Sequence, residues 1–201
     1  ETFESPVFGL VYPAGKVSSA LIGWAMNTML AQVTWSLGGE NEFKIMDNYT
    51  GWKETMNNLS AIPAVDAALI FSRKTRDWSV KNKDSYSEEL MGTSQFLSSK
   101  QIQHTFILDD ALLNQDLSRF PVLLAPGLEC ISDEQAGKLR NYVSSGGTLF
   151  LTGEAYRFSS YGEPRKTWIF EDMISENQMK NTSDTSLSET FYGKGRIIYN
   201  P

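Results

Sequence analysis

Residues 132–155 have the sequence SDEQAGKLRNYVSSGGTLFLTGEA, and this stretch decides the fold. It begins with a capping box, in which the Ser132 side chain accepts a hydrogen bond from the Gln135 amide and the Gln135 side chain reaches back. An apolar stripe at helical spacing follows, which predicts a helix over 132–145. Two glycines end that helix, and residues 148–151 form a buried strand.

The segments on either side repeat this alternation. A continuous apolar run at residues 65–71, broken only by Asp66, is typical of a strand buried on both faces. We expect further strands at 104–108, 121–126, 187–192 and 196–199, and helices at about 86–100 and near 168–174. Strands that alternate with helices form a mostly parallel sheet that helices cover on both faces. The predicted fold class is therefore α/β, with a flavodoxin-like three-layer sandwich.

The N-terminal part has a different pattern. Residues 16–31 have helical apolar spacing, residues 32–37 are β-prone with no partner strand beside them in the sequence, and a second helix is expected around 50–59. Pro63 disfavours helix for the residue before it and marks a boundary. The sequence thus predicts a helix–strand–helix segment over 1–62 and an α/β domain over 63–201.

Bulk properties exclude some classes of partner. The net charge of −6 argues against nucleic acid, whose phosphates require a basic protein surface. No apolar run approaches the roughly 20 residues that a membrane span requires, so we expect no membrane partner. The chain opens with Glu-Thr-Phe-Glu and lacks a basic leader, so we expect it to be part of a longer protein. Nothing in the sequence indicates the compartment.

Only one cysteine and one histidine are available for chemistry. A single Cys130 excludes an internal disulfide and a cysteine-based metal cluster, and a single His104 excludes a multi-histidine site, so we expect no metal and no cofactor. Cys130 precedes the helix that starts after Ser132, which favours a small apolar role. His104 opens a strand at the edge opposite the carboxyl-end crevice, which favours a structural role.

The turn after the strand at 148–151 is the place where many α/β enzymes hold a nucleophile. Here it reads Thr152-Gly153-Glu154-Ala155, without serine or cysteine. Gly153 and Glu154 therefore mark a degenerate nucleophile position, and we expect no catalytic residue in this chain. One alternative stays open, in which Glu154 pairs with a second carboxylate, Glu129 or Asp77, to hydrolyse glycosides.

Three further residues are candidates for contacts. Arg76 and Trp78 lie in a polar, basic loop predicted over 72–85, which suits a partner or a small anion. Trp35 ends the short strand at 32–37, and aromatic rings serve both as sugar platforms and as core residues.

Residues 65–155 also resemble the trimerisation domain of glycoside hydrolase family 42 β-galactosidases. The similarity extends in order over close to half the chain. It is carried by residues 67–72, Tyr86, Glu89, Leu90, 117–126, Leu128, 131–136, 142–149 and 152–154. The tail at 192–199 is similar to the ending that follows such domains.

Residues 16–59 resemble the last part of the TIM barrel that precedes this domain in those enzymes. The resemblance implies that the catalytic carboxylates lie on earlier barrel strands, which this chain does not contain. It also implies that Trp35 is a remnant of the sugar site. The trimerisation domain itself is similar to a class I glutamine amidotransferase fold that has lost its chemistry. Gly153-Glu154 at the turn, with no later histidine, agrees with that loss.

These observations favour a non-catalytic α/β domain of a glycoside hydrolase involved in carbohydrate metabolism. We expect it to self-associate, as a trimer, or to pack against a catalytic TIM barrel in its parent protein. Two rival hypotheses remain, a small carboxylate-dependent glycosidase and a module that binds sugars or anions in the crevice at the strand carboxyl ends.

Overall fold

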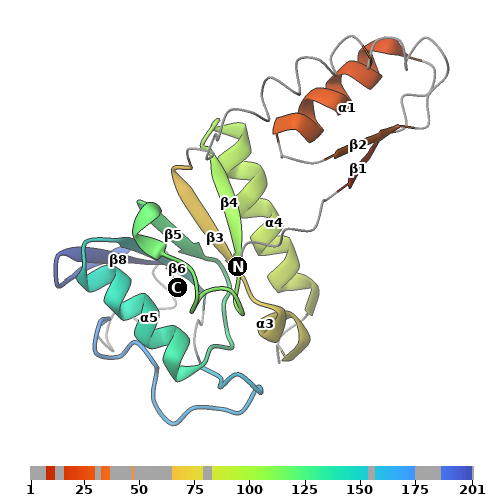
Figure 1. The fold of residues 1–201 in the computed structure, drawn as a ribbon. Helices are drawn as coiled ribbons and strands as arrows, with labels where there is room; N and C mark the ends of the chain where they lie inside the picture. Colours follow the sequence, from red (N-terminus) through yellow and green to blue (C-terminus); the bar gives the residue numbers. More distant parts are fainter. Residues whose placement is uncertain are drawn as a thin grey trace. The chain divides into compact units, whose positions relative to one another are not determined.

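The chain forms two compact units, Glu1–Pro63 and Ala64–Pro201. The structure is a computed structural model, and it describes residues 8–11, 16–29, 33–36, 47, 65–78, 83–153, 157–174 and 187–200. Figure 1 shows the elements of both units. Because their relative placement is not determined, each unit is considered by itself.

The N-terminal unit contains a strand–helix–strand sequence. Strand β1 (Phe8–Val11) pairs in parallel with β2 (Val33–Ser36), and helix α1 (Val17–Met29) connects them and contacts both. The expectation that the second strand has no partner was wrong. Strand β1 is only four residues long and contains Gly9, so its β pattern is weak. The helix predicted around 50–59 lies outside the described residues.

The second unit is built on a six-stranded sheet in the order β4-β3-β5-β6-β8-β7. All neighbouring pairs are parallel except β7–β8, which form an antiparallel hairpin. The strands are β3 (Ala67–Phe71), β4 (His104–Leu108), β5 (Val122–Ala125), β6 (Thr148–Thr152), β7 (Ser188–Tyr192) and β8 (Gly195–Asn200). The five parallel strands follow the flavodoxin-like order 2-1-3-4-5. The predicted α/β class with a mostly parallel sheet is confirmed.

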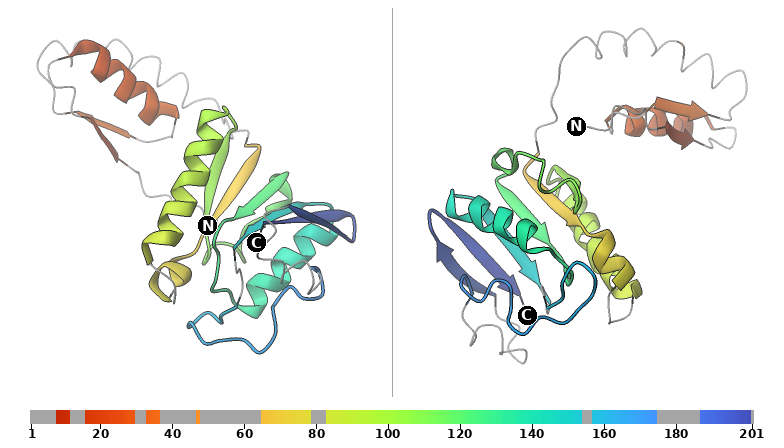
Figure 2. Two further views of the ribbon diagram at one scale, coloured as in Figure 1. Left: turned by 180° about the vertical axis from the view of Figure 1, so that it is seen from behind. Right: turned by 60° about the horizontal axis from the view of Figure 1, so that its bottom comes forward.

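Helices lie on both faces of this sheet (Figure 2). Helix α4 (Lys83–Ser99) packs on β3 and β4 through Tyr86, Leu90 and Leu97. Helix α5 (Asp133–Ser144) packs on the opposite face, where Leu139 and Val143 join the larger core. The predicted capping box of α5 is present, with Ser132 Oγ accepting from the Gln135 amide at 3.1 Å and Gln135 Oε1 accepting from the Ser132 amide at 3.0 Å.

Two local predictions were wrong. The polar segment after β3 is not all loop, because residues 73–78 form helix α3 (Arg73–Trp78). Ser72 starts this helix by accepting a hydrogen bond from the Thr75 amide at 3.0 Å, an N-cap that the sequence analysis missed. The helix expected near 168–174 is a run of turns that buries Phe170 and Met173. Apolar spacing there indicated the buried side but not the backbone conformation.

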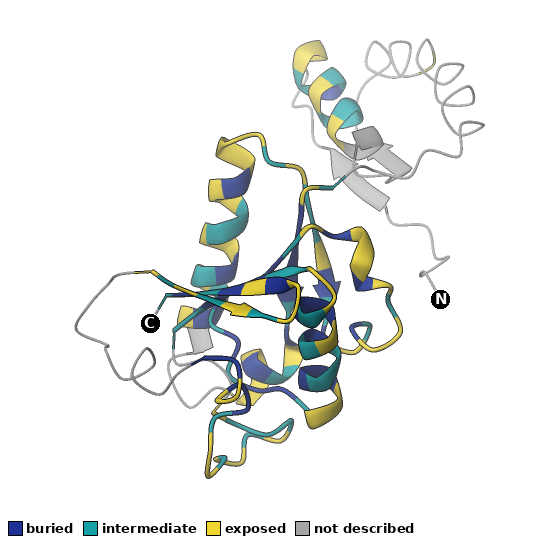
Figure 3. Ribbon diagram, turned by 90° about the vertical axis from the view of Figure 1, so that its left-hand side faces the viewer, coloured by how far each residue is buried: buried dark blue, intermediate teal, exposed yellow. Residues whose placement is uncertain are grey.

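Burial differs between the two faces of the sheet (Figure 3). On the α5 face, the paired residues Ala68, Leu123, Leu149 and Ile197 form a row across four strands, and all are buried. On the other face, the neighbouring row consists of Phe106, Leu69, Leu124, Phe150, Ile198 and Glu189. Only Leu69 in that second row is fully buried, and exposure increases toward both ends of the row, with Phe106 on β4 45% exposed.

Candidate functional site

The carboxyl edge of the parallel strands is the place where α/β folds of this kind bind ligands. The strand order reverses between β3 and β5, so the crevice should open between Ser72, after β3, and Gly127, after β5. We therefore examined which side chains meet at this edge and what bonds they form.

A buried polar network occupies this reversal point. The hydroxyl of Ser72 donates to Asp109 Oδ2 at 3.0 Å. The hydroxyl oxygen of Thr75 accepts from the amides of Glu129 and Cys130 at 3.2 and 3.0 Å. The Gln135 side-chain amide donates to the Asp109 carbonyl at 2.6 Å, and these polar side chains are all buried. The network joins α3, the loops after β4 and β5, and α5, so its evident role is structural.

The phenol of Tyr86 adds to this network from α4. Its oxygen accepts the Ser72 amide at 2.7 Å. Burial is the main cause that raises the pKa of Tyr86 to about 12, so the phenol is neutral at physiological pH. A neutral, hydrogen-bonded phenol fixes the N-terminus of α3.

Gly153 directly follows β6 and is the described part of the predicted elbow. Gly153 has a φ of +68°, a left-handed conformation that side chains other than glycine rarely adopt. Its amide donates to the Asn200 carbonyl at 2.9 Å, and its carbonyl accepts from the Tyr199 hydroxyl at 3.0 Å. Both backbone groups of Gly153 are thus bonded to β8. Glu154 lies outside the described residues.

One carboxylate that the sequence analysis did not treat as a site residue reaches this edge. Glu89, a half-buried residue of α4, accepts a hydrogen bond from the Thr152 hydroxyl, and Thr152 Oγ1 accepts the Gly127 amide at 2.9 Å. A Cβ at Gly127 would lie 2.7 Å from Glu89 Oε2. Glu89 thus fills the space between the loops after β5 and β6. One signal in the sequence could have indicated this position of Glu89. It is next to Leu90, and the apolar spacing of the helix places Leu90 on the side that faces the sheet.

Cys130 and His104 occupy structural positions. Cys130 is buried, and burial is the main cause that raises the pKa of its thiol to about 11, which disfavours the nucleophilic thiolate. His104 begins β4 at the opposite edge of the sheet. Its Nε2 lies 2.8 Å from Ser94 Oγ and its Nδ1 lies 3.0 Å from the Ile102 carbonyl oxygen.

Two of the three predicted contact residues lie on the same helix in the structure. Arg76 and Trp78 both lie on α3, and Trp78 is 55% exposed. Trp35 lies on β2 of the other unit, paired with Leu10, and its side chain is not described. Arg76 forms an ion pair with Asp77 at 2.8 Å, so it is not an isolated cation.

The other cations of α3 are paired as well. Arg73 forms an ion pair with Asp110, and Lys74 Nζ lies 3.8 Å from Asp110 Oδ1. A surface pocket of about 570 Å³ adjoins Lys74, Ser132 and Tyr161, and it also contains Asp110 and Asp133. The mixture of charges gives this carboxyl-edge pocket no strong preference for an anion.

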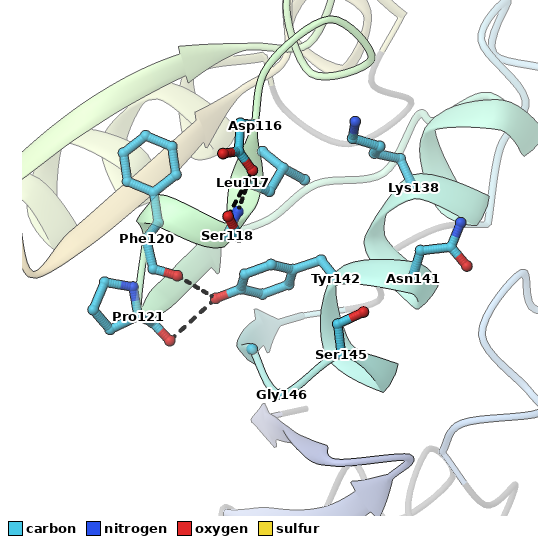
Figure 4. Close-up of a pocket in the computed structure, with 11 residues that line it drawn as sticks. Asp116, Leu117, Ser118, Phe120, Pro121, Lys138, Asn141, Tyr142, Ser145 and Gly146 are labelled. Carbon is cyan, nitrogen blue, oxygen red and sulfur yellow. Dashed lines mark hydrogen bonds between the residues drawn. The ribbon is translucent and has the colours of Figure 1, made fainter.

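A second pocket, of about 480 Å³, lies at the amino edge, opposite the expected crevice (Figure 4). Tyr142 projects from α5 into its wall, with its hydroxyl 3.0 Å from the Phe120 carbonyl oxygen and 3.1 Å from that of Pro121. The Thr148 carbonyl oxygen is 3.2 Å away. Burial raises the pKa of Tyr142 to about 12. The neutral phenol thus ties the starts of β5 and β6 to the helix.

Two kinds of site are absent from the described residues. No group of three or more His, Cys, Asp or Glu side chains is positioned there to hold a metal ion. In the same part of the chain, no helix has the length and apolar character to cross a membrane.

Comparison with known proteins identifies the fold. Residues 65–161 match the family model described as "Beta-galactosidase trimerisation domain". No curated protein matches the chain. Several solved structures do, at identities that establish the fold alone.

Three of these structures illustrate the likeness. Gan42B, a GH42 beta-galactosidase from G. stearothermophilus, has a TM-score of 0.65 and 13% identity over 92% of this chain and 37% of its own. The beta-galactosidase from Bacillus circulans sp. alkalophilus has a TM-score of 0.67 and 13% identity over 88% and 38%. The exo-carrageenase GH42 from Bacteroides ovatus has a TM-score of 0.62 and 9% identity over 92% and 25%. This chain therefore spans well under half of each protein.

Proposed function

We propose that this chain is a non-catalytic assembly part of a glycoside hydrolase, because residues 65–161 match the family model described as "Beta-galactosidase trimerisation domain". Its task is to hold copies of the parent enzyme together. The family match is the observation that carries this proposal. The substrate of the parent enzyme is left open, because structural neighbours with the same fold are named both as beta-galactosidases and as an exo-carrageenase.

The chemistry of the carboxyl edge supports an assembly role. Ser72, Thr75, Asp109 and Gln135 bond to one another or to backbone groups. The single thiol, Cys130, is buried and protonated at neutral pH. A hydrolase requires a nucleophile or base that is accessible to substrate. These groups instead stabilise the fold.

The N-terminal unit supports the proposal that residues 1–62 are the end of a TIM barrel. β1, α1 and β2 form one parallel strand–helix–strand unit. Parallel pairs occur almost only within larger sheets that helices cover, and two strands alone are marginally stable. Helix α1 also exposes Val17, Ile22 and Met26, which suits packing against neighbouring barrel elements.

The test is the mass of the 201-residue chain in solution. Size-exclusion chromatography with light scattering, run over a wide concentration range, should yield a species of three times 22.6 kDa. A trimer, or a concentration-dependent approach to one, supports the proposal. A strict monomer at the highest concentration would overturn self-association through this chain.

A sugar-binding module is the second candidate, because two exposed aromatic residues lie beside the carboxyl-edge pocket. Tyr161 lines this pocket, and the next residue in its loop, Gly162, lies against Trp78 of α3. Aromatic faces are the usual platforms for sugars. Galactose should then raise the melting temperature of the chain but not that of Trp78→Ala. The carboxylate glycosidase remains a prediction, and equal turnover in Glu154→Gln and the unmodified chain would contradict it.

A further inference from the structure

Two neighbouring pockets adjoin the start of α5 and share one wall. The carboxyl-edge pocket, of about 570 Å³, and a second pocket, of about 550 Å³, are both lined by Asp133 and Arg165. The second pocket, which we call the Trp168 pocket, lies between α5 and residues 165–172. Those residues belong to a segment that runs alongside α5 and is drawn in light blue in Figure 1. The Arg165–Asp133 ion pair therefore stands between two pockets that one elongated ligand can occupy.

This ion pair is held in a fixed position. Arg165 Nη1 lies 2.6 Å from Asp133 Oδ1. Arg165 also donates to the Ile131 carbonyl oxygen at 2.8 Å and to that of Phe158 at 3.3 Å, and its side chain is only 20% exposed. The Asp133 side chain is 81% exposed, so its carboxylate can still accept hydrogen bonds from a ligand. A fixed and accessible acceptor thus lies at the centre of the two pockets.

Other charged groups along the pockets are also paired with one another. In the Trp168 pocket, Arg140 Nε lies 3.2 and 3.1 Å from the two carboxylate oxygens of Asp172. In the carboxyl-edge pocket, Lys74 Nζ lies 3.8 Å from Asp110 Oδ1. The lining residues of both pockets comprise four cationic and six carboxylate side chains, a net charge of −2. Such a lining disfavours sulfate and phosphate groups and suits a neutral ligand with many hydroxyl groups.

An aromatic side chain lines each pocket. Tyr161 lines the carboxyl-edge pocket and is 76% exposed. Trp168 lines the other pocket, where Arg157 lies over its ring at 5.0 Å and the Tyr199 ring contacts it edge-on at 6.5 Å between centroids. Aromatic rings beside hydrogen-bonding side chains are suited to sugars, which have both apolar and hydroxyl faces. Two such rings, one on each side of the ion pair, suit a chain of sugar units.

We propose that the two pockets together bind a linear, neutral oligosaccharide. One sugar unit lies at Tyr161, another lies at Trp168, and hydroxyl groups between them donate to Asp133. This ligand role is independent of the assembly function. It rests on the sugar-binding candidate above and extends it from a single sugar to a chain.

Calorimetric titration of the whole chain tests the ligand class. The probes are galactose, β-1,4-galactotetraose and a sulfated galactan tetrasaccharide. Galactotetraose should bind roughly tenfold more tightly than galactose, or better, because it contacts both pockets. The sulfated chain should bind roughly tenfold more weakly than galactotetraose, because the lining has a net negative charge. Equal affinity for galactose and galactotetraose would overturn the proposal.

A matched set of variants locates the contacts. Tyr161→Ala should weaken the binding of both neutral probes, whereas Trp168→Ala should weaken galactotetraose far more than galactose. Asp133→Ala, at an exposed side chain, should also weaken galactotetraose. Trp168→Phe retains an aromatic ring and should bind both probes, which keeps the test valid if Trp168→Ala unfolds. The control is Phe191→Ala on β7, because Phe191 is as exposed as Tyr161 at 76% and lines neither pocket.

The outcomes separate this inference from the proposed functions. If both neutral probes bind equally and only Tyr161→Ala weakens them, the single-sugar candidate stands and the chain-binding role is wrong. If neither probe binds, both sugar roles are wrong, while light scattering decides the assembly function separately. If the sulfated chain binds most tightly, the ligand is an anionic polymer and the neutral class is wrong.

Discussion

Strands β3 and β6 are both parallel strands of one sheet, yet they are buried differently. Four of the five residues of β3 are buried, whereas β6 alternates between buried and partly exposed positions. The difference follows from chain connections. Because the strand order reverses once, the β3–β4 connection places α4 on one face, and α5 lies on the other. The described parts of the connections after β4 and β6 also add their buried residues to the α5 side.

This contrast indicates how the two ends of the sheet divide their roles. Strand β3 is covered on both faces and stabilises the single chain. Among the described residues, the helix that packs along β6 and β8 lies on one face only.

The largest expected effect compares two aliphatic residues of one cross-strand row. Leu69→Ala on β3 removes a fully buried side chain beneath α4 and should lower the free energy of unfolding by about 2–5 kcal/mol. Ile198→Ala on β8, which is partly exposed, should cost only about 1 kcal/mol. Urea unfolding of both variants at low protein concentration measures the difference. Equal costs would mean that Ile198 is covered within the single chain as fully as Leu69.

The sequence indicated the covered end better than the open end. The unbroken apolar run at 65–71 correctly predicted a strand buried on both faces. The run at 148–152 alternates Thr, Leu, Phe, Leu and Thr, and both Thr and Phe are common on strands, covered or not. Whether a helix covers Phe150 depends on where connections distant in the sequence cross the sheet. The burial of Phe150 is therefore determined by topology and not by the local sequence pattern.

The second prediction concerns the network at the reversal point. Thr75→Val preserves the side-chain volume but removes the oxygen that accepts the amides of Glu129 and Cys130. The buried amide of Cys130 and the partly buried amide of Glu129 would then lack their acceptor, and the free energy of unfolding should fall by about 1–3 kcal/mol. Thr75→Ser retains the oxygen and should recover most of the loss. If Thr75→Val is as stable as the unmodified chain, water reaches this point and the crevice is more open than the hydrogen bonds indicate.

Some site residues were predicted from the sequence and others were missed. The difference again depends on whether the feature is local in the sequence or is formed only by the fold. The end of β6 at Thr152 was predicted to within one residue, because a strand followed by Thr-Gly is a local pattern, and Gly153 has a positive φ. Glu89 was missed as a contributor, because it comes from α4 and meets Thr152 only through the fold. The helical state of Arg76 and Trp78 was missed because the N-cap role of Ser72 was not considered.

A third prediction uses the two buried phenols, one on each helix layer. The pKa values of Tyr86 and Tyr142 are raised from 10.0 to about 12, so the folded chain holds these protons more tightly than the unfolded chain. Their contribution to stability is complete below pH 10 and is lost as the pH rises from 10 to 12. The urea midpoint should therefore fall over this range. Tyr142→Phe should reduce the slope, and an unchanged slope would contradict the burial of this phenol.

The smallest expected effect concerns an exposed ion pair between β7 and β8. Glu189→Gln removes the ion pair with Arg196, in which the side chains are 44% and 48% exposed. In the monomer the free energy of unfolding should change by less than about 1 kcal/mol, because water screens exposed pairs. The measurement is urea unfolding at low and high salt, with the small difference vanishing at high salt. A loss that persists in salt and exceeds this range would show that β7 and β8 are covered in the single chain, and the contrast with β3 would no longer hold.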